Sequence, residues 1–346
     1  MNTIIGELGK SQKFVDIVKE IENKKSPIDI SGLTDVGMIQ ILLGINEYAK
    51  KPIALITYNE IQAKQIVDNL KAFTDKVIFF PKKEIVTYDY IAESKDLPYE
   101  RIDALNKIKE KRTPIIVTTI ESLMQKLPSK ETLYKNAINL KIGEVYSLEE
   151  LKQKLVNLGY VRCDLIEGRG QFSVRGGILD ISLDDKIGVR IEFWGDEVDS
   201  IRNFAIVSQR SINALDKVEI HPAHEYILEA KIEDICKKIR KNITDDKQEE
   251  IVEEDIEQIK AGNYISKIDK YFDCFYNKQE TLIDYLKDNY IIAVDEESKV
   301  SQRAINILQD INNLSKALLE KEKIVPQALN GMLTYDVIDE KIEKSG

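Results

Sequence analysis

The feature that most constrains the fold of this chain is the alternation of short apolar segments with helical patterns in its first part. Four segments are short, contain β-branched residues and are flanked by proline or polar residues, as buried strands are. These segments are Pro27–Ser31, Pro52–Thr57, Val77–Phe80 and Pro114–Thr118. Apolar residues recur at spacings of three and four, typical of helices, in Gly37–Ala49, Glu60–Phe73 and Tyr99–Lys111. This alternation predicts a parallel sheet covered by helices.

The pattern changes near residue 140, where strands follow one another with few helices between them. A helix is expected over Leu148–Leu158, and Gly195-Asp196 reads as a short glycine turn that closes a hairpin. The expected strands are Tyr160–Asp164, Gln171–Arg175, Ile178–Ser182, Val189–Trp194 and Glu197–Asn203. This part of the chain is predicted to be a small, mainly antiparallel insert.

Helical character returns after His221-Pro222, and the apolar strand Tyr290–Val294 precedes a long helix over Ser298–Glu322. We expect that strand to be a late member of the first sheet. The predicted fold is therefore an α/β domain interrupted by a small α+β domain. Residues 1–138 form the first part of the α/β domain, 139–222 the insert, and 223–346 the return to the first domain. The acidic stretch Asp245–Glu257 is interpreted as the solvated face of a helix.

Composition favours a protein partner over nucleic acid. The 346 residues suffice for two or three compact domains. The formal net charge of −10 means that the chain lacks the overall basic field that drives sequence-independent DNA binding. No apolar run approaches the length of a membrane helix, and Met1–Glu7 does not read as a secretory signal.

Metal and disulfide chemistry are not expected. The cysteines Cys163, Cys236 and Cys274 lie far apart and are odd in number, which argues against a disulfide framework or a CxxC metal site. The chain has only two histidines, His221 and His224, which leaves few candidate zinc ligands. We therefore expect a reduced, cytoplasmic protein without a metal or a cofactor.

A loop after the first expected strand resembles a phosphate-binding loop that has lost its function. The pattern G-x-x-x-x-G-K-[ST] is matched at Gly32 and Gly37, but Met38 takes the lysine position and Ile39 the Ser/Thr position. A thioether and an aliphatic side chain can neither meet the β- and γ-phosphates nor ligate magnesium. Asp35 also adds a carboxylate where phosphate would lie. One such unfavourable contact costs about 1.4 kcal/mol or more, a tenfold loss in affinity.

A second partial motif supports the same interpretation. Asp295 and Glu296 follow the apolar strand Tyr290–Val294, where a second nucleotide motif would hold magnesium. Two glycines five residues apart, or a strand that ends in Asp-Glu, can each arise by chance. Together, in a strand-helix chain, they predict a helicase-type, P-loop NTPase-like domain with a degenerate phosphate loop and no catalytic residue.

Alternation in the insert predicts an exposed polar face. The apolar residues of Val189–Trp194 share one face, whereas Arg190, Glu192 and Trp194 share the other. The same reasoning places Arg175 on the polar face. Tryptophan and arginine are enriched among interface hot spots, so a protein-binding surface is favoured. Two alternatives stay open: Trp194 covers a core neighbour, or it stacks on a nucleic-acid base, although acidic residues crowd the same hairpin.

Three motifs resemble a known family. They are Gly170–Ile181 (GQFSVRGGILDI), Arg190–Glu197 (RIEFWGDE) and Ser208–Ser211 (SQRS). They are similar to the N-terminal region of the bacterial transcription-repair coupling factors (Mfd), which is homologous to the excision-repair protein UvrB. His221–Glu225 and Tyr271–Glu296 are similar as well, so the resemblance covers nearly the whole chain.

Two departures favour the coupling factors over UvrB itself. The loop lacks the lysine and Ser/Thr of an active ATPase, and Tyr88–Tyr90 passes into the helix Tyr99–Lys111 without room for a DNA-probing hairpin. Gln209-Arg210-Ser211 also favours the coupling factors.

The resemblance implies a role in transcription-coupled nucleotide excision repair. The insert would bind UvrA and recruit it to a stalled RNA polymerase, with contacts at Arg175, Arg190 and Trp194, the last usually phenylalanine in the family. The full-length family is an ATP-dependent DNA translocase that meets RNA polymerase and DNA through domains that this sequence does not include. This chain itself is expected not to be an enzyme. The alternatives are a UvrB-type DNA-dependent ATPase and a damaged-DNA binding module.

Overall fold

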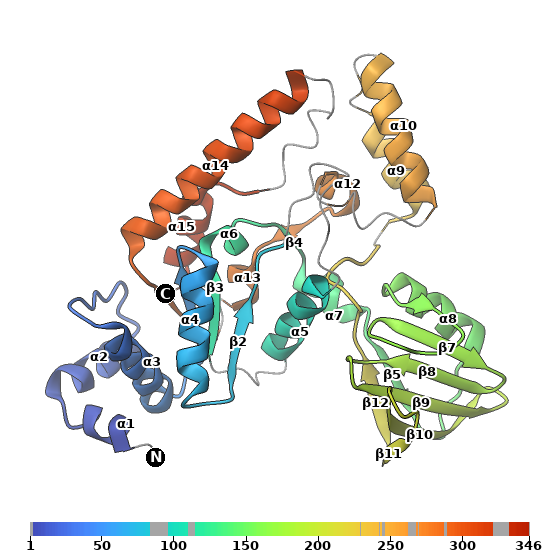
Figure 1. Cartoon of the computed structure of the whole chain (residues 1–346), viewed down its shortest axis with the longest axis horizontal. Helices are drawn as coiled ribbons and strands as arrows, with labels where there is room; N and C mark the ends of the chain where they lie inside the picture. Colours follow the sequence, from blue (N-terminus) through green and yellow to red (C-terminus); the bar gives the residue numbers. More distant parts are fainter. Residues whose placement is uncertain are drawn as a thin grey trace. The chain divides into compact units, whose positions relative to one another are not determined.

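The computed structural model describes residues 3–83, 96–109, 115–228, 230–241, 243, 246–261, 268, 270–286, 289–320 and 332–345. The chain divides into two compact units (Figure 1). Unit 1 comprises Met1–Leu127, Lys237–Phe272 and Gln279–Gly346, and unit 2 comprises Pro128–Cys236 and Asp273–Lys278.

Unit 1 is built on a four-stranded parallel sheet with the order β14-β1-β3-β2. The strands are β1 (Ile53–Thr57), β2 (Val77–Phe80), β3 (Ile115–Thr119) and β14 (Ile291–Val294). Every residue of β1 and β3 is buried, as central strands of a parallel sheet are when helices cover both faces. The expected α/β fold with a parallel sheet is confirmed, and the late strand joins β1 in register, with Ile53 opposite Ile291.

Helices pack on this sheet through apolar stripes. Thr34 caps α3 (Asp35–Ala49) by accepting a hydrogen bond from the N–H of Gly37 at 3.2 Å. Asn59 caps α4 (Glu60–Lys71) by accepting from the N–H of Gln62 at 2.8 Å. Such caps satisfy backbone donors that the helix leaves unpaired. The core that joins these helices to the sheet includes Ile39, Leu42, Ile66, Leu70, Ile53, Leu55 and Val117.

The expected strand Pro27–Ser31 is wrong. These residues have no regular structure, and apart from Ile28 their side chains are exposed. A strand needs a neighbour with free backbone groups, and the described sheet ends at β14 and β2 without pairing to this segment. Pro27 has no N–H to donate to a ladder, and only Ile28 and Ile30 in the segment are apolar. Local composition alone therefore does not hold this segment in a sheet.

Unit 2 contains a six-stranded sheet with the order β11-β10-β9-β8-β7-β6. Its strands are β6 (Val161–Arg162), β7 (Gln171–Arg175), β8 (Ile178–Ser182), β9 (Ile187–Trp194), β10 (Glu197–Ala205) and β11 (Ser211–Leu215). All neighbours are antiparallel except β6 and β7. The expected turn is confirmed, since Trp194 pairs with Glu197 across Gly195-Asp196 and Gly195 has a φ of 64°, which glycine adopts without strain.

The inner face of this sheet is apolar. Its buried residues include Phe172, Leu179, Ile181, Val189, Ile191 and Ile201. A two-stranded antiparallel sheet, β5 (Ile138–Lys141) with β12 (Lys217–Ile220), belongs to the same unit. So does helix α8 (Leu148–Asn157), which Ser147 caps.

The other described elements are mostly helical. They are α1 (Thr3–Leu8), α2 (Gln12–Glu22), α5 (Leu97–Lys109), α6 (Ile120–Leu123), α7 (Lys130–Lys135), α9 (Ile232–Arg240), α10 (Asp246–Lys260), α12 (Phe272–Phe275), α13 (Leu282–Leu286), α14 (Glu297–Glu320) and α15 (Tyr335–Glu343), with the short strands β4 (Leu127–Pro128) and β13 (Gln279–Glu280). Of the helices in the described part of the chain, none is both long and apolar enough to cross a membrane.

Candidate protein-docking surface

The outer face of the six-stranded sheet carries polar residues in register. Residues directly opposite one another on an antiparallel sheet share a face and lie about 5 Å apart. One row across β7 to β10 is Ser173, Asp180, Arg190 and Arg202, and the next is Arg175, Ile178, Glu192 and Ser200. Trp194 follows Glu192 by two positions, so it lies on the same face beyond the second row. The three residues expected to bind a partner, Arg175, Arg190 and Trp194, are therefore brought to one face.

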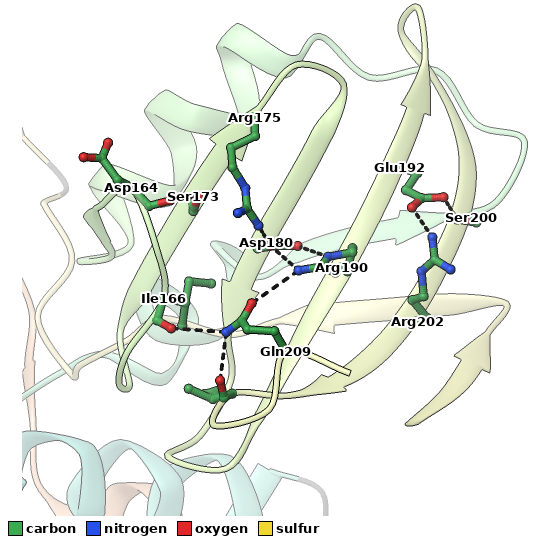
Figure 2. A network of polar contacts seen from close by, with 11 residues as sticks. Asp164, Ile166, Ser173, Arg175, Asp180, Arg190, Glu192, Ser200, Arg202 and Gln209 are labelled. Carbon is green, nitrogen blue, oxygen red and sulfur yellow. Dashed lines mark hydrogen bonds and ion pairs between the residues drawn. The ribbon is translucent and has the colours of Figure 1, made fainter. Parts of the chain in front are cut away.

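Asp180 links two of these residues in an arginine–aspartate cluster of Arg175, Asp180 and Arg190 (Figure 2). The Asp180 side chain is only 2% exposed. It accepts hydrogen bonds from Nη2 of Arg175 at 2.9 Å and from Nε and Nη2 of Arg190 at 2.7 and 2.8 Å. A buried carboxylate requires such partners to offset its loss of hydration. The hydrogen bond to Asp180 is also the main reason that the pKa of Arg190 is raised.

Arg190 is held from two further sides. Its guanidinium lies 4.8 Å from the centre of the Phe204 ring, a favourable cation–π distance. Gln209 accepts a hydrogen bond from Nη2 of Arg190 at 3.4 Å and donates to the backbone oxygen of Ile206 at 2.8 Å (Figure 2). Phe204 packs with Ile166 and Ile206 in a small apolar cluster. The arginine is thus fixed by the sheet and by the loops beside it.

A second ion pair lies beside the cluster on the same face. Glu192 pairs with Arg202 and accepts a hydrogen bond from the hydroxyl of Ser200 at 2.9 Å (Figure 2). The side chains of Arg202 and Glu192 are about one-third exposed, at 34% and 31%. This pair adds no net charge to the face, where three arginines lie with two carboxylates.

Trp194 and Arg175 are the accessible members of the expected site. Trp194 is 85% exposed, which excludes the alternative that it covers a core neighbour. The Arg175 side chain is 50% exposed, compared with 18% for Arg190. Large apolar side chains are seldom left this exposed. Exposed tryptophan and arginine side chains on one face are typical of interaction sites.

The two key positions of the expected phosphate loop, Met38 and Ile39, lie in helix α3 and pack inward. Ile39 is 3% exposed, and it and Met38 pack in the hydrophobic core of unit 1. Both positions that would serve a nucleotide are therefore occupied by core side chains. Thr34 uses its hydroxyl to cap α3, and Asp35 lies in the first helical turn. The segment thus forms the start of helix α3.

Asp35 lies close enough to Asp295 to help raise its pKa. Burial, followed by the nearby charges of Glu296 and Asp35, raises the pKa of Asp295. Gln62 donates a hydrogen bond to Asp295 at 2.7 Å, and Glu296 pairs with Lys299 at 2.7 Å. These residues line an open cleft of roughly 2460 Å³. Gly32, Asp35, Met38, Ile39, Asp295 and Glu296 of the expected degenerate nucleotide site line this cleft, whereas Gly37 does not, and lysines such as Lys24, Lys50 and Lys299 line it too.

One sequence argument lies outside the described residues. The segment Tyr88–Tyr90, on which the comparison with a DNA-probing hairpin depends, belongs to residues 84–95. Conversely, sequence reasoning missed the roles of Asp180, Phe204 and Arg202. An acidic residue inside an apolar strand, on the strand between those that carry Arg175 and Arg190, was the signal available for Asp180.

The fold and this surface define a protein of two units, the second built on a mainly antiparallel sheet with a polar outer face. The family model described as "UvrB interaction domain" matches residues 138–226. Residues 138–226 include every strand of the six-stranded sheet and all members of the arginine–aspartate cluster.

The similarity extends beyond that domain. The chain is 31% identical over 340 residues to "Transcription-repair-coupling factor" of Bacillus subtilis (strain 168). The aligned region covers 94% of the chain and 29% of that protein. A protein of the same name from Staphylococcus aureus (strain bovine RF122 / ET3-1) is 26% identical over 333 residues, covering 92% of the chain and 28% of the relative. The one from Staphylococcus epidermidis (strain ATCC 35984) is 28% identical over 309 residues, covering 85% and 26%.

These matches place the chain in the transcription-repair-coupling factor family, as its UvrB-like N-terminal region. The resemblance predicted from the sequence is confirmed, and so are the themes of DNA repair and transcription-coupled nucleotide excision repair. The chain spans less than a third of the length of the curated relatives it matches.

Proposed function

We propose that the outer face of the six-stranded sheet docks UvrA and so recruits it during transcription-coupled nucleotide excision repair. The observation that carries this proposal is an 85% exposed Trp194 on the same sheet face as two arginines that share one buried carboxylate. The family resemblance names UvrA as the partner, with contacts at Arg175, Arg190 and Trp194. The docking domain is proposed to span residues 139–222, within the α/β domain formed by 1–138 and 223–346.

The chemistry of this face suits directional recognition. Trp194 offers a large apolar surface that a pocket can bury, which is how interface anchors stabilise a complex. Arg175 keeps Nε and Nη1 outside its bond to Asp180, so these donors can meet carboxylate or carbonyl oxygens of a partner. Asp180 and Glu192 pair with the three arginines of this face and leave about one positive charge, far less than the basic patch that a nucleic-acid backbone requires.

The α/β unit is proposed to be a scaffold that binds no nucleotide. Met38 and Ile39 pack in the core, and Asp35 and Asp295 place carboxylates in the adjoining cleft. We therefore interpret unit 1 as a P-loop NTPase-like, helicase-type domain with a degenerate loop, and this chain as non-catalytic. In the full-length protein, other domains would bind RNA polymerase and DNA and supply the translocase activity. This role belongs to the bacterial cytoplasm.

The docking proposal is tested by calorimetry with purified UvrA. Arg175→Ala and Trp194→Ala are each expected to weaken binding by about 2 kcal/mol, roughly 30-fold, because hot-spot truncations have this size. Ile61→Ala is a matched control, since Ile61 is an apolar residue 81% exposed on α4 of unit 1, and it should leave the affinity unchanged. If both docking variants bind UvrA as tightly as the parent chain, this surface is not the docking site.

A further inference from the structure

We propose that Asp180 is a positioning residue of the docking surface, which holds Arg175 and Arg190 as a preset pair for a carboxylate of the partner. This inference rests on the proposed function, because it concerns how the same face recognises UvrA. It assigns a docking role to a residue that would not touch the partner through its own buried side chain.

The sheet by itself does not bring the two arginines together. Arg175 is on β7 and Arg190 on β9, with β8 between them. Two strand spacings separate their backbones by about 10 Å. Asp180 lies on the intervening strand, opposite Arg190 and Ser173, and both arginine side chains converge on its carboxylate (Figure 2).

The two guanidinium groups share a single oxygen atom. Oδ2 of Asp180 accepts from Nη2 of Arg175 at 2.9 Å and from Nη2 of Arg190 at 2.8 Å, while Oδ1 accepts from Nε of Arg190 at 2.7 Å. Without a carboxylate between them, two like charges this close would repel and the side chains would separate. Asp180 therefore sets their spacing as well as their direction.

This arrangement lowers the cost of binding. A free arginine side chain loses substantial rotamer entropy when a partner immobilises it. Arg190 is already held by Asp180, by the Phe204 ring and by Gln209, so little of its freedom remains to be lost. Arg175 is half exposed, with one donor anchored. Preorganisation of this kind raises affinity without adding a contact.

The charge of the cluster indicates the chemistry of the partner group. Two guanidinium groups face one carboxylate, which leaves one positive charge in a half-buried setting. Nη1 of Arg190 and the Nε and Nη1 donors of Arg175 take no part in the bonds to Asp180. A second carboxylate, from the partner, would neutralise the cluster and accept from these donors in the paired geometry that arginine favours.

A role of Asp180 in fold stability alone does not explain why Arg175 also bonds to it. The bidentate bond from Arg190 already pairs the buried charge of Asp180. The Arg175 side chain is 50% exposed, so solvent screens its end of this pair and limits what the bond contributes to stability. The bond from Arg175 to Asp180 is thus of small value to the fold but places a guanidinium beside Arg190.

The test is a mutant cycle in the whole chain, in which the affinity of each variant for UvrA is measured. Asp180→Asn changes charge with almost no change of shape and is expected to weaken binding at least tenfold. In an Arg175→Gln/Arg190→Gln background, the same substitution is expected to change affinity less than twofold, because Asp180 acts through these arginines. Asp164→Asn removes an exposed carboxylate of the same unit and should leave affinity unchanged in either background.

An NMR measurement distinguishes a positioning role of Asp180 from a role in fold stability alone. In the parent chain, the Nε–H signal of Arg190 in ¹H–¹⁵N spectra should be shifted and protected from exchange, since Nε donates to Asp180 at 2.7 Å. Asp180→Asn should abolish that protection while the backbone signals of the sheet persist. Should Asp180→Asn fail to fold, Asp180→Glu keeps the charge, moves it by one methylene, and is expected to weaken binding about fivefold.

The outcomes distinguish this inference from the proposed function. If Arg175→Gln and Arg190→Gln bind UvrA as tightly as the parent, the docking surface itself is wrong. If these variants bind weakly but folded Asp180→Asn, or Asp180→Glu in its place, retains full affinity, the docking surface stands and the positioning role is overturned. An equal loss on Asp180→Asn in both backgrounds would also overturn it.

Discussion

His224 links the protonation of a single buried side chain to the stability of unit 2. It is 5% exposed, and its Nδ1 accepts a hydrogen bond from the N–H of Tyr226 at 3.2 Å. It packs so closely on Gly159, whose φ is +86°, that a Cβ there would lie 2.1 Å from Nε2. Burial lowers the pKa of His224 to about 4 from an ordinary value of 6.5.

This shift predicts a loss of stability in acid. Because the folded pKa is the lower one, the unfolded chain takes up the proton first. Stability is full above pH 6.5 and falls as the pH drops from 6.5 towards 4, by roughly 3 kcal/mol in total. Urea unfolding at pH 7 and pH 5 measures this change. His224→Leu should flatten the dependence relative to the parent, whereas His221→Asn should keep it; equal slopes for parent and His224→Leu would contradict the assignment.

Trp194 provides a direct optical reading of docking. It is the single tryptophan of the chain, and its side chain is 85% exposed, so the emission of the free protein should be that of tryptophan in water. Burial in a pocket of UvrA should shift the emission to shorter wavelength, because an apolar environment stabilises the excited state less than water does. Titration of Trp194→Phe, which is silent, corrects for the partner's own emission. An unshifted spectrum at saturation would mean that Trp194 stays in solvent.

At the scale of elements, helix α3 begins with a segment whose side chains cap the helix and pack in the core. Met38 and Ile39 face the core, and Thr34 caps the helix. Restoring a hydroxyl by Ile39→Thr should therefore not restore a site. It is expected to destabilise the chain by about 2 kcal/mol, because it buries a polar group and removes core volume.

Chemical denaturation of the purified chain measures this prediction. Ile305→Thr is a suitable control, because Ile305 is 44% exposed on α14, and the same change there should cost little. Equal stability of the Ile39→Thr chain and the parent would show that α3 is not packed through this residue.

At the scale of the whole molecule, the net charge of −10 argues against DNA as a ligand, and the packing of Met38 and Ile39 in the core of unit 1 argues against a nucleotide. Mg–ATP at millimolar concentration is expected to produce neither binding heat nor a rise in melting temperature. A ligand at 100 times its Kd would stabilise the folded state by about 2.7 kcal/mol, so a thermal shift assay would detect it. A clear magnesium-dependent rise would restore the alternative of a UvrB-type ATPase, and DNA affinity that falls steeply with salt would restore that of a damaged-DNA binding module.

Much of the fold follows from local patterns. The strands β1, β2 and β3 and the helices α3 and α4 begin and end within two residues of their predicted limits, because apolar periodicity and capping residues act over one or two turns. The polar face that carries Arg175, Arg190 and Trp194 also follows from strict alternation along β7 and β9. The motifs around these residues were specific enough to indicate the family.

Other features depend on which segments meet. Pro27–Ser31 has a strand-like composition but no strand structure, since pairing depends on a partner elsewhere in the chain. The role of Asp180 arises from β7 and β9 lying on either side of β8, and the exposure of Trp194 from its place at a hairpin end. Periodicity and motifs, which are local, thus specify the elements and the family. Strand neighbours, shared carboxylates and burial come from long-range packing, because their energies belong to contacts between distant residues.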